Sequence, residues 1–240
     1  MTSIDLNADL GEGFGLWRMA DDEALLQVVT SANVACGFHA GDPPTMRRVC
    51  ELAAARDVRI GAHVSYRDLA GFGRRYLAVD PAELRDEITY QIAARDGMAR
   101  AAGTRVSYVK AHGALYNRTV TDPEHAAALI EGAREFSPRL PLLALPGSVV
   151  VKLAGEAGSP TIGEGYPDRR YTPDGQLTPR TEPGSVLSDP AEVSANALAL
   201  AVGGALASLC LHGDNPAAVE LARRTRAALL AAGHEITAFA

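Results

Sequence analysis

The amino-acid sequence predicts a single α/β domain, a barrel of parallel strands that alternate with helices. Short apolar runs of strand type are separated by helical segments of roughly ten to twenty residues, which is the pattern of a parallel sheet. Polar residues gather where these runs end, on the face where α/β barrels build their active sites. A chain of 240 residues can bury one full core, so we expect one domain over residues 1–240.

The predicted strands are seven short apolar runs bounded by polar or turn-forming residues. They cover Ser3–Asn7, Ala32–Ala35, Val58–Gly61, Val106–Val109, Leu140–Leu145, Thr161–Gly163 and Ser208–Leu211. Because helical segments separate them, neighbouring strands are expected to run parallel.

Five helix starts are marked by a capping residue directly before a proline. These pairs are Asp42-Pro43, Asp80-Pro81, Asp122-Pro123, Asp189-Pro190 and Asn215-Pro216. The side chain of a capping residue accepts a hydrogen bond from the first helical turn, and proline fits next because its missing N–H would be unpaired there. Glu83 and Glu192 add the acidic third residue of a capping box.

Charge and composition exclude several classes of function. A net charge of −6 with no long run of Lys or Arg argues against a nucleic-acid partner. The longest apolar stretch, Ala197–Leu211, is interrupted by glycines and too short to span a membrane. The first residues lack the features of a secretion signal, so we expect a cytoplasmic protein. Cys36, Cys50 and Cys210 have no CxxC spacing and are expected to be buried thiols.

Four of the six histidines stand at predicted strand ends, near glycine residues that leave the imidazole accessible. These are His39, His63, His112 and His212, and their equivalent positions indicate a site. His125 and His234 lie in helix or turn contexts and are interpreted as surface residues.

Carboxylates and a lysine accompany these histidines. Asp9 and Glu12 follow the first strand, and Asp9 with His63 and His112 would suit a divalent transition metal with open positions. A metal-free site, in which the same groups act as acids, bases and hydrogen-bond donors, is the alternative. Lys110 precedes His112 by two residues, so alternation predicts that both point into one cleft.

Loops beyond the strand ends supply candidates for substrate recognition. The stretch 167–189 is too long for an ordinary turn and is interpreted as a functional loop or lid. Arginines in such loops can clamp a carboxylate or phosphate, and Arg74 and Arg170 are considered with the others. The candidate substrate-binding residues are Asn33, Asp42, Arg75, Asp168, Arg169, Arg180 and Asp214. The sequence lacks a GxxxxGK[ST] nucleotide loop and a GxSxG elbow.

Several of these segments resemble the LamB/YcsF family, with motifs in the same order from residue 4 to about residue 236. The matching segments are Asp5–Glu12, Ser31–Asp42, Gly71–Arg75, Val109–Asn117, Asp168–Tyr171, Leu177–Arg180 and Leu211–Asp214. The resemblance implies a seven-stranded (β/α) barrel similar to sugar deacetylases that hold a metal with one Asp and two His. Asp9, His63 and His112 match those metal positions.

The resemblance also implies an activity: ATP-dependent hydrolysis of 5-oxo-L-proline to L-glutamate by a multi-subunit 5-oxoprolinase. Two further subunits, B and C, would bind most of the ATP and activate the lactam by phosphorylation, in agreement with the missing nucleotide loop. The catalytic candidates are then Asp9, Glu12, His39, Lys110, His112 and His212. Asp9 or Glu12 would activate water, and Lys110 and His212 would stabilise the oxyanion or departing phosphate.

Two other functions stay open at this point. The first is a metal-dependent deacetylase or amidohydrolase that acts alone and needs no ATP. The second is a non-catalytic subunit that only holds or delivers the ring. A metal analysis of the purified chain and the effect of Asp9→Asn on turnover would separate these functions.

Overall fold

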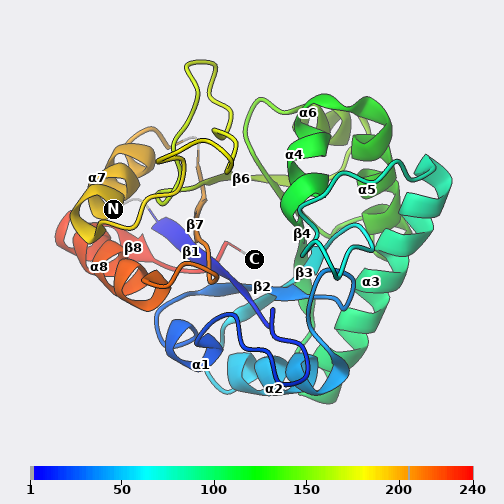
Figure 1. Ribbon diagram of the computed structural model, residues 1–240, viewed down its shortest axis with the longest axis horizontal. Helices are drawn as coiled ribbons and strands as arrows, with labels where there is room; N and C mark the ends of the chain where they lie inside the picture. Colours follow the sequence, from blue (N-terminus) through cyan, green and yellow to red (C-terminus); the bar gives the residue numbers. More distant parts are fainter. Residues whose placement is uncertain (1–2, 205, 240) are drawn as a thin grey trace.

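Seven parallel strands close into a barrel in the computed structural model, which describes residues 3–204 and 206–239 (Figure 1). The strands are β1 (Ser3–Leu10), β2 (Ser31–Ala35), β3 (Arg59–Val64), β4 (Val106–Ala111), β5 (Leu142–Ala144), β6 (Thr161–Gly165) and β7 (Ser208–Leu211). They pair in chain order, and β1 closes the ring because it pairs with both β2 and β7. The predicted barrel of seven parallel strands is confirmed.

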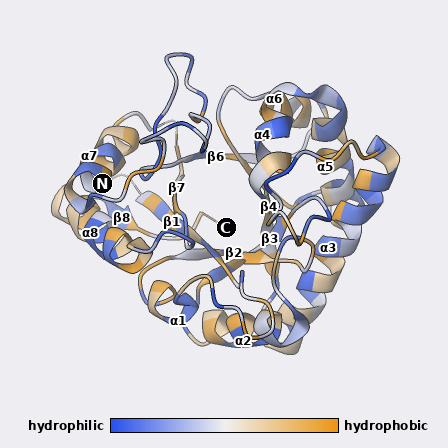
Figure 2. Cartoon of the chain, viewed as in Figure 1, coloured by the Kyte–Doolittle hydropathy of each residue, from blue (hydrophilic) through white to orange (hydrophobic). Residues whose placement is uncertain are grey.

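An eighth strand, β8 (Glu235–Ile236), pairs in parallel with the first residues of β1 and was not predicted. The helices are α1 (Asp22–Leu25), α2 (Pro43–Ala54), α3 (Pro81–Ala101), α4 (Gly113–Thr121), α5 (Pro123–Phe136), α6 (Val149–Glu156), α7 (Pro190–Ala201) and α8 (Ala218–Ala231). They surround the barrel on its outside (Figure 1). Their ribbons carry both hydrophobic and hydrophilic residues, as expected of helices with one buried face (Figure 2).

Four of the five predicted helix starts are confirmed at the residue. The side chains of Asp42, Asp80, Asp122 and Asp189 each accept a hydrogen bond from a backbone N–H of the first turn of α2, α3, α5 and α7. The fifth start is wrong by two residues, because α8 begins at Ala218 and not at Pro216. The Asn215 side chain instead accepts from the N–H of Ala217, closing a turn before the helix.

The barrel interior is polar along β1, because alternate residues of a strand point to the same side. Asp5, at the lower end, accepts hydrogen bonds from the hydroxyls of Ser31 and Ser208, and burial raises its pKa to about 6. Asn7 comes next and accepts from Asn33 Nδ2 at 2.6 Å. The same row ends in Asp9, which the strand therefore places at the upper end of the barrel.

Aromatic rings fill the barrel below Asp9. The Tyr108 ring occupies the space that a Cβ at Gly61 would need, since that atom would lie 2.2 Å from Tyr108 Cε2. The Tyr108 hydroxyl donates to Asn33 Oδ1 at 2.7 Å. On its other side, the ring centroid of Phe239 lies 5.0 Å from that of Tyr108, so the last described residue of the chain packs against the same ring.

Three further expectations concern burial. Cys36, Cys50 and Cys210 are buried and free, as predicted. His125 is buried, which contradicts its interpretation as a surface residue: its Nδ1 lies 2.6 Å from the hydroxyl of Tyr66, in the space between the long loop after β3 and α5. Among the described residues, no helix is both long and apolar enough to cross a membrane.

The described residues belong to one barrel and the elements around it, which supports the proposal of a single domain over residues 1–240; residues 1, 2, 205 and 240 lie outside the described part. Residues 167–189, drawn in yellow at the top of Figure 1, form a folded loop and not an extended strap. Two short antiparallel bridges, Arg169 with Val186 and Tyr171 with Leu177, hold it together.

Candidate active site

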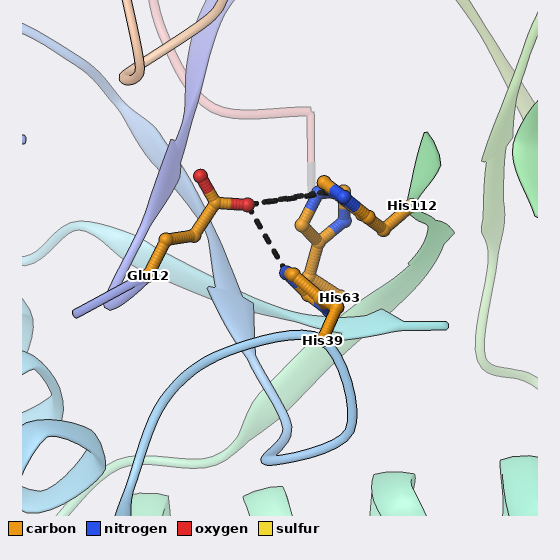
Figure 3. Close-up of side chains that lie close together, drawn as sticks. All are labelled: Glu12, His39, His63 and His112. Atoms are coloured by element: carbon orange, nitrogen blue, oxygen red, sulfur yellow. Dashed lines mark hydrogen bonds and ion pairs between the residues drawn. The ribbon is translucent and has the colours of Figure 1, made fainter. Parts of the chain in front are cut away.

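Glu12, His39, His63 and His112 converge at the upper end of the barrel (Figure 3). One ligand atom from each lies within 4.8 Å of the others, and all four side chains are buried. Glu12 Oε1 is 3.1 Å from His39 Nε2 and 3.4 Å from His112 Nδ1. His112 Nδ1 is 3.1 Å from His63 Nε2.

Each of these groups stands where a strand gives way to a loop or helix. His63 belongs to the last residues of β3, and His112 directly follows β4 as the residue before α4. His39 lies in the turn between β2 and α2. Glu12 lies two residues after the end of β1. Between them, Gly11 adopts a positive φ of 68°, which changes the direction of the chain at the end of the strand.

The outer nitrogens of two imidazoles donate to backbone carbonyls. His112 Nε2 donates to the carbonyl of Phe72 at 2.8 Å, and His63 Nδ1 donates to the carbonyl of Lys110 at 3.3 Å. The inner nitrogens, His112 Nδ1 and His63 Nε2, face each other, and the inner nitrogen of a neutral ring held in this way carries a lone pair. Such outer hydrogen bonds are what orients histidine ligands in metal sites.

The protonation states also suit a cation. Burial lowers the pKa of both His39 and His112 well below the usual value, and the neighbouring imidazoles lower it further, so both rings are neutral near pH 7. Burial raises the pKa of Glu12 well above its usual value, and the nearby carboxylate of Asp9 adds to this effect. A positive ion between these groups would oppose the burial penalty of the carboxylate.

These observations agree with a divalent transition metal, because one carboxylate and three imidazoles are a common donor set. Within the described residues, His39 Nδ1, at the other edge of the ring from Nε2, is buried with no hydrogen-bond partner. The predicted ligands Asp9, His63 and His112 do come together, with Asp9 Oδ1 3.4 Å from His63 Nε2. The tighter set, however, contains Glu12 and His39 beside the two histidines.

Lys110 lies beneath the cluster as a buried cation between two acids. Its Nζ is 2.9 Å from Glu164 Oε2, 3.5 Å from Asp9 Oδ1 and 3.0 Å from Cys210 Sγ. Burial alone would lower its pKa, but the carboxylates of Asp9 and Glu164 and the Cys210 sulfur raise it well above the usual value. Burial would likewise raise the pKa of Asp9, yet Lys110 and His63 hold it well below the usual range.

A cavity of about 380 Å³ opens above these groups. Its polar lining includes Asp9, His63, Lys110 and His112 on one side and, from loops, Arg74, Arg169, Arg180 and His212 on the other. Lys110 and His112 thus point into the same cleft, as predicted from alternation.

His212 lines the cavity and is held by a buried carboxylate. Its Nδ1 donates to Asp168 at 2.9 Å, its backbone N–H donates to the same carboxylate, and its ring stacks on Tyr166. Burial would raise the pKa of Asp168, but His212 holds it below the usual value. The Asp168 carboxylate therefore fixes the orientation of the His212 ring, which is the arrangement of an acid–base histidine.

Not all predicted arginines reach this cavity. Asp214 pairs with Arg74 at 2.5 Å and with Arg180 at 3.6 Å, while Arg169 donates to loop carbonyls of Ser185 and Thr178. In contrast, Arg75 pairs with Asp68 and Arg170 pairs with Glu192, and neither is among the residues that line the cavity.

Six more predicted residues lie outside the cavity lining, namely Glu12, His39, Asn33, Asp42, Asp168 and Asp214. Asn33 is buried below it, where its Nδ2 donates to Asp9 Oδ1 at 2.8 Å. Asp42 caps α2 and accepts from the N–H of Gly15 at 2.7 Å. Sequence reasoning missed Glu164, which directly follows the predicted strand run Thr161–Gly163 and lies within the observed β6. Its position at a strand end was the available signal, because a carboxylate buried there needs a cation.

Fold and site together define a (β/α)-barrel protein with an acid–histidine cluster at the carboxyl ends of its strands. Residues 4–240 match the LamB/YcsF family, and the chain therefore belongs to this family. It is 59% identical to the A component of the 5-oxoprolinase of Streptomyces avermitilis, over 99% of this chain and 100% of that protein.

Solved structures agree with the fold. The crystal structure of the lactam utilization protein from Thermus thermophilus superposes with a TM-score of 0.94 at 40% identity, over 99% of this chain and 100% of that one. A family 4 carbohydrate esterase from Streptomyces lividans superposes with a TM-score of 0.56 at 9% identity, over 100% of this chain and 93% of that one. The second likeness shows that the two proteins share the barrel fold.

Proposed function

We propose that this chain is the hydrolytic component of a multi-subunit 5-oxoprolinase and opens the ring of 5-oxo-L-proline to give L-glutamate. The observation that carries the proposal is the cavity in which Asp9, His63 and His112 face cationic side chains from the loops, with Glu12 and His39 in contact with His112. Close relatives along the full length are named as the A component of 5-oxoprolinase, which supports the same role. The B and C subunits would supply ATP-dependent activation in the cytoplasm, with ATP bound mainly by them.

The chemistry explains why activation and an acid are both needed. A five-membered lactam is a stable amide, and phosphorylation of its carbonyl oxygen by the partners makes the ring carbon electrophilic. Water then adds to that carbon and gives a proton to a carboxylate. The adduct can lose phosphate, which returns the lactam, or it can break its C–N bond, which opens the ring.

Protonation of the ring nitrogen decides between these outcomes, because an amine leaves only after it has gained a proton. His212, oriented by Asp168, faces the cavity and would donate this proton. Ring opening leaves an acyl phosphate, and a second water releases glutamate and phosphate. Lys110 at the cavity floor would stabilise negative charge on oxygen during both additions.

In a metal-free site, Glu12 is the better candidate for the base that accepts the proton from water, because its raised pKa makes it a stronger base than Asp9, whose carboxylate is stabilised by Lys110 and His63. Alternatively, Glu12 with His39, His63 and His112 would hold a divalent metal that supplies Lewis acidity, and the base would then be Asp9, which lines the cavity. Asn33, below the cavity, would hold Asp9 in place.

The carboxylate of the substrate would lie among Arg74, Arg169 and Arg180, which line the loop side of the cavity. Arg75 and Asp42 were also predicted to bind substrate, but neither lines the cavity; Arg75 pairs with Asp68, and Asp42 caps α2. Guanidinium groups bind carboxylates through paired hydrogen bonds, so these arginines would orient the ring.

The test is reconstitution of the three components and measurement of ATP-dependent glutamate release from 5-oxoproline. His112→Ala should abolish release while leaving ATP hydrolysis by the partners measurable. Full turnover by this variant would refute the assigned site. Because the donor set also suits a deacetylase, the chain alone should be tested on acetylated sugars and amides with zinc and without ATP; hydrolysis there would favour that second function.

A further inference from the structure

The loop between β3 and α3 contains a strained residue next to the active site. Phe72 has a φ of 55°, and among the described residues only Asp57 shares a positive φ without being glycine. A Cβ disfavours this conformation, so it persists only where the surroundings enforce it. Gly73 follows with a φ of 63°, which makes two consecutive left-handed residues.

The backbone carbonyls of Phe72 and Gly73 both accept hydrogen bonds from the segment that follows β4. The Phe72 carbonyl accepts from His112 Nε2 at 2.8 Å, and the Gly73 carbonyl accepts from the N–H of Ala114 at 2.9 Å. Both contacts fall on the start of α4, immediately after β4. The loop after β3 is thus hydrogen-bonded to the residues that follow β4. One of these hydrogen bonds is made by the outer nitrogen of His112, a histidine of the cluster.

Glycines make this contact close. A Cβ on Gly73 would lie 2.3 Å from Ser65 Oγ and 2.8 Å from His112 Cδ2. A Cβ on Gly113 would lie 2.5 Å from the Gly73 carbonyl oxygen. The glycines of two sequence motifs, Gly71–Arg75 and Val109–Asn117, are therefore parts of one interlocked turn.

Arg75 and Asp68 hold the ends of this turn together. The Asp68 carboxylate accepts from the N–H of Gly71 at 2.9 Å and pairs with the Arg75 guanidinium, while its backbone carbonyl accepts from Gly73 N–H at 2.9 Å. The hydrogen bond from Arg75 lowers the pKa of Asp68, so this pair stays charged near neutral pH. The ring of Phe72 completes the turn by packing edge-on against His39 and His112.

We propose that Phe72 and Gly73, clamped by Asp68 and Arg75, form a positioning turn that fixes His112 as its Nε2–H tautomer. A backbone carbonyl can only accept, so it selects the tautomer that keeps the Nδ1 lone pair directed at Glu12 and His63. Arg75 then acts on this turn and not on substrate. The inference rests on the proposed function only in assigning a role within the same site.

The tautomer is measured directly by nitrogen NMR of ¹⁵N-histidine-labelled, chelator-treated protein, with the His112 signals assigned by their loss in His112→Gln. We expect the Nε2–H form in the wild type. A predominant Nδ1–H form would overturn the proposal. The spectrum needs no substrate, ATP or partner, so failure of the proposed function leaves this result readable.

Two variants of Phe72 separate the contribution of its backbone carbonyl from that of its aromatic ring. Phe72→Gly keeps the carbonyl and removes the strain, so it should retain the Nε2–H form and melt roughly 2–8 °C above Phe72→Ala. Asp57→Gly, at the other strained residue, should leave the His112 signals unchanged. If Phe72→Gly and Phe72→Ala both show the same loss of the Nε2–H tautomer of His112, the Phe72 ring positions His112 and the proposal is wrong.

Displacing the turn should have the opposite effect. Gly73→Ala introduces the clashes with Ser65 and His112 and should make the two tautomers comparably populated. Because this variant can also fail to fold, Arg75→Met provides a second test at a side chain that is 63% exposed. It should fold, yet show a mixture of tautomers; a pure Nε2–H signal in Arg75→Met would refute the clamp.

Discussion

Replacement of Lys110 by Met tests the charge arrangement beneath the cluster. The lysine is buried, with Glu164 at 2.9 Å and Asp9 at 3.5 Å. Its removal leaves carboxylates buried without their cation, and breaking a buried pair in this way costs about 3–5 kcal/mol. For a chain of 240 residues this corresponds to a fall in melting temperature of roughly 6–20 °C.

The stability that Lys110→Met loses relative to the wild type should depend on pH. In the wild type, Lys110 and His63 hold the folded-state pKa of Asp9 below its unfolded value, so this carboxylate stabilises the fold above about pH 4 and loses that effect as pH falls through the folded pKa. Without Lys110, burial dominates and raises the folded pKa. The ionised carboxylate then destabilises the variant most at neutral pH, and acidification relieves this destabilisation by protonation.

The assay is thermal unfolding of both proteins at pH 8 and pH 5, with a chelator present so that no metal contributes. Lys152→Met is the matched control, because Lys152 is the only other lysine in the sequence and is exposed on α6. The control should change stability by less than about 0.5 kcal/mol. A Lys110→Met variant that melts with the wild type, or whose deficit grows at pH 5, would refute the reasoning.

Two further predictions concern single side chains. Asp168→Asn should lower kcat of the reconstituted complex by about 10³–10⁴-fold, because an amide can donate to His212 Nδ1 and hold the wrong tautomer; a fall of less than about tenfold would remove this histidine from proton transfer. Asp42→Ala should lower stability by about 1 kcal/mol through loss of the α2 cap. Thermal unfolding measures this loss, while an unchanged KM for 5-oxoproline would show that Asp42 is structural and a raised KM would assign it to substrate.

The barrel and the histidine positions could be predicted because both follow from local patterns. Strand-type runs that alternate with capped helices fix the parallel sheet, and the carboxyl ends of its strands must then lie on one face. His63 and His112 came together for that reason. The short elements α1 and β8 carried no comparable signal, because they have too few residues to show a period.

The sequence could not predict which of two neighbouring side chains reaches the site. Asp9 lies in β1, where alternation applies, but Glu12 reaches the cluster through the positive φ at Gly11. Likewise, Arg74 lines the cavity while Arg75 pairs with Asp68, because the left-handed residues before them rotate the chain. Such turns are set by contacts with distant segments, and the order of residues does not reveal them.

The aromatic floor formed by Tyr108 and Phe239 has a consequence for substrate entry and product release. Because these rings fill the barrel from below, substrate and product would use the same cavity entrance, beneath the folded loop 167–189. Under the proposed function, a partner that delivers the activated ring would have to cover this entrance and exclude bulk water. Glutamate would then leave only after that partner dissociates, so substrate delivery and product release would alternate.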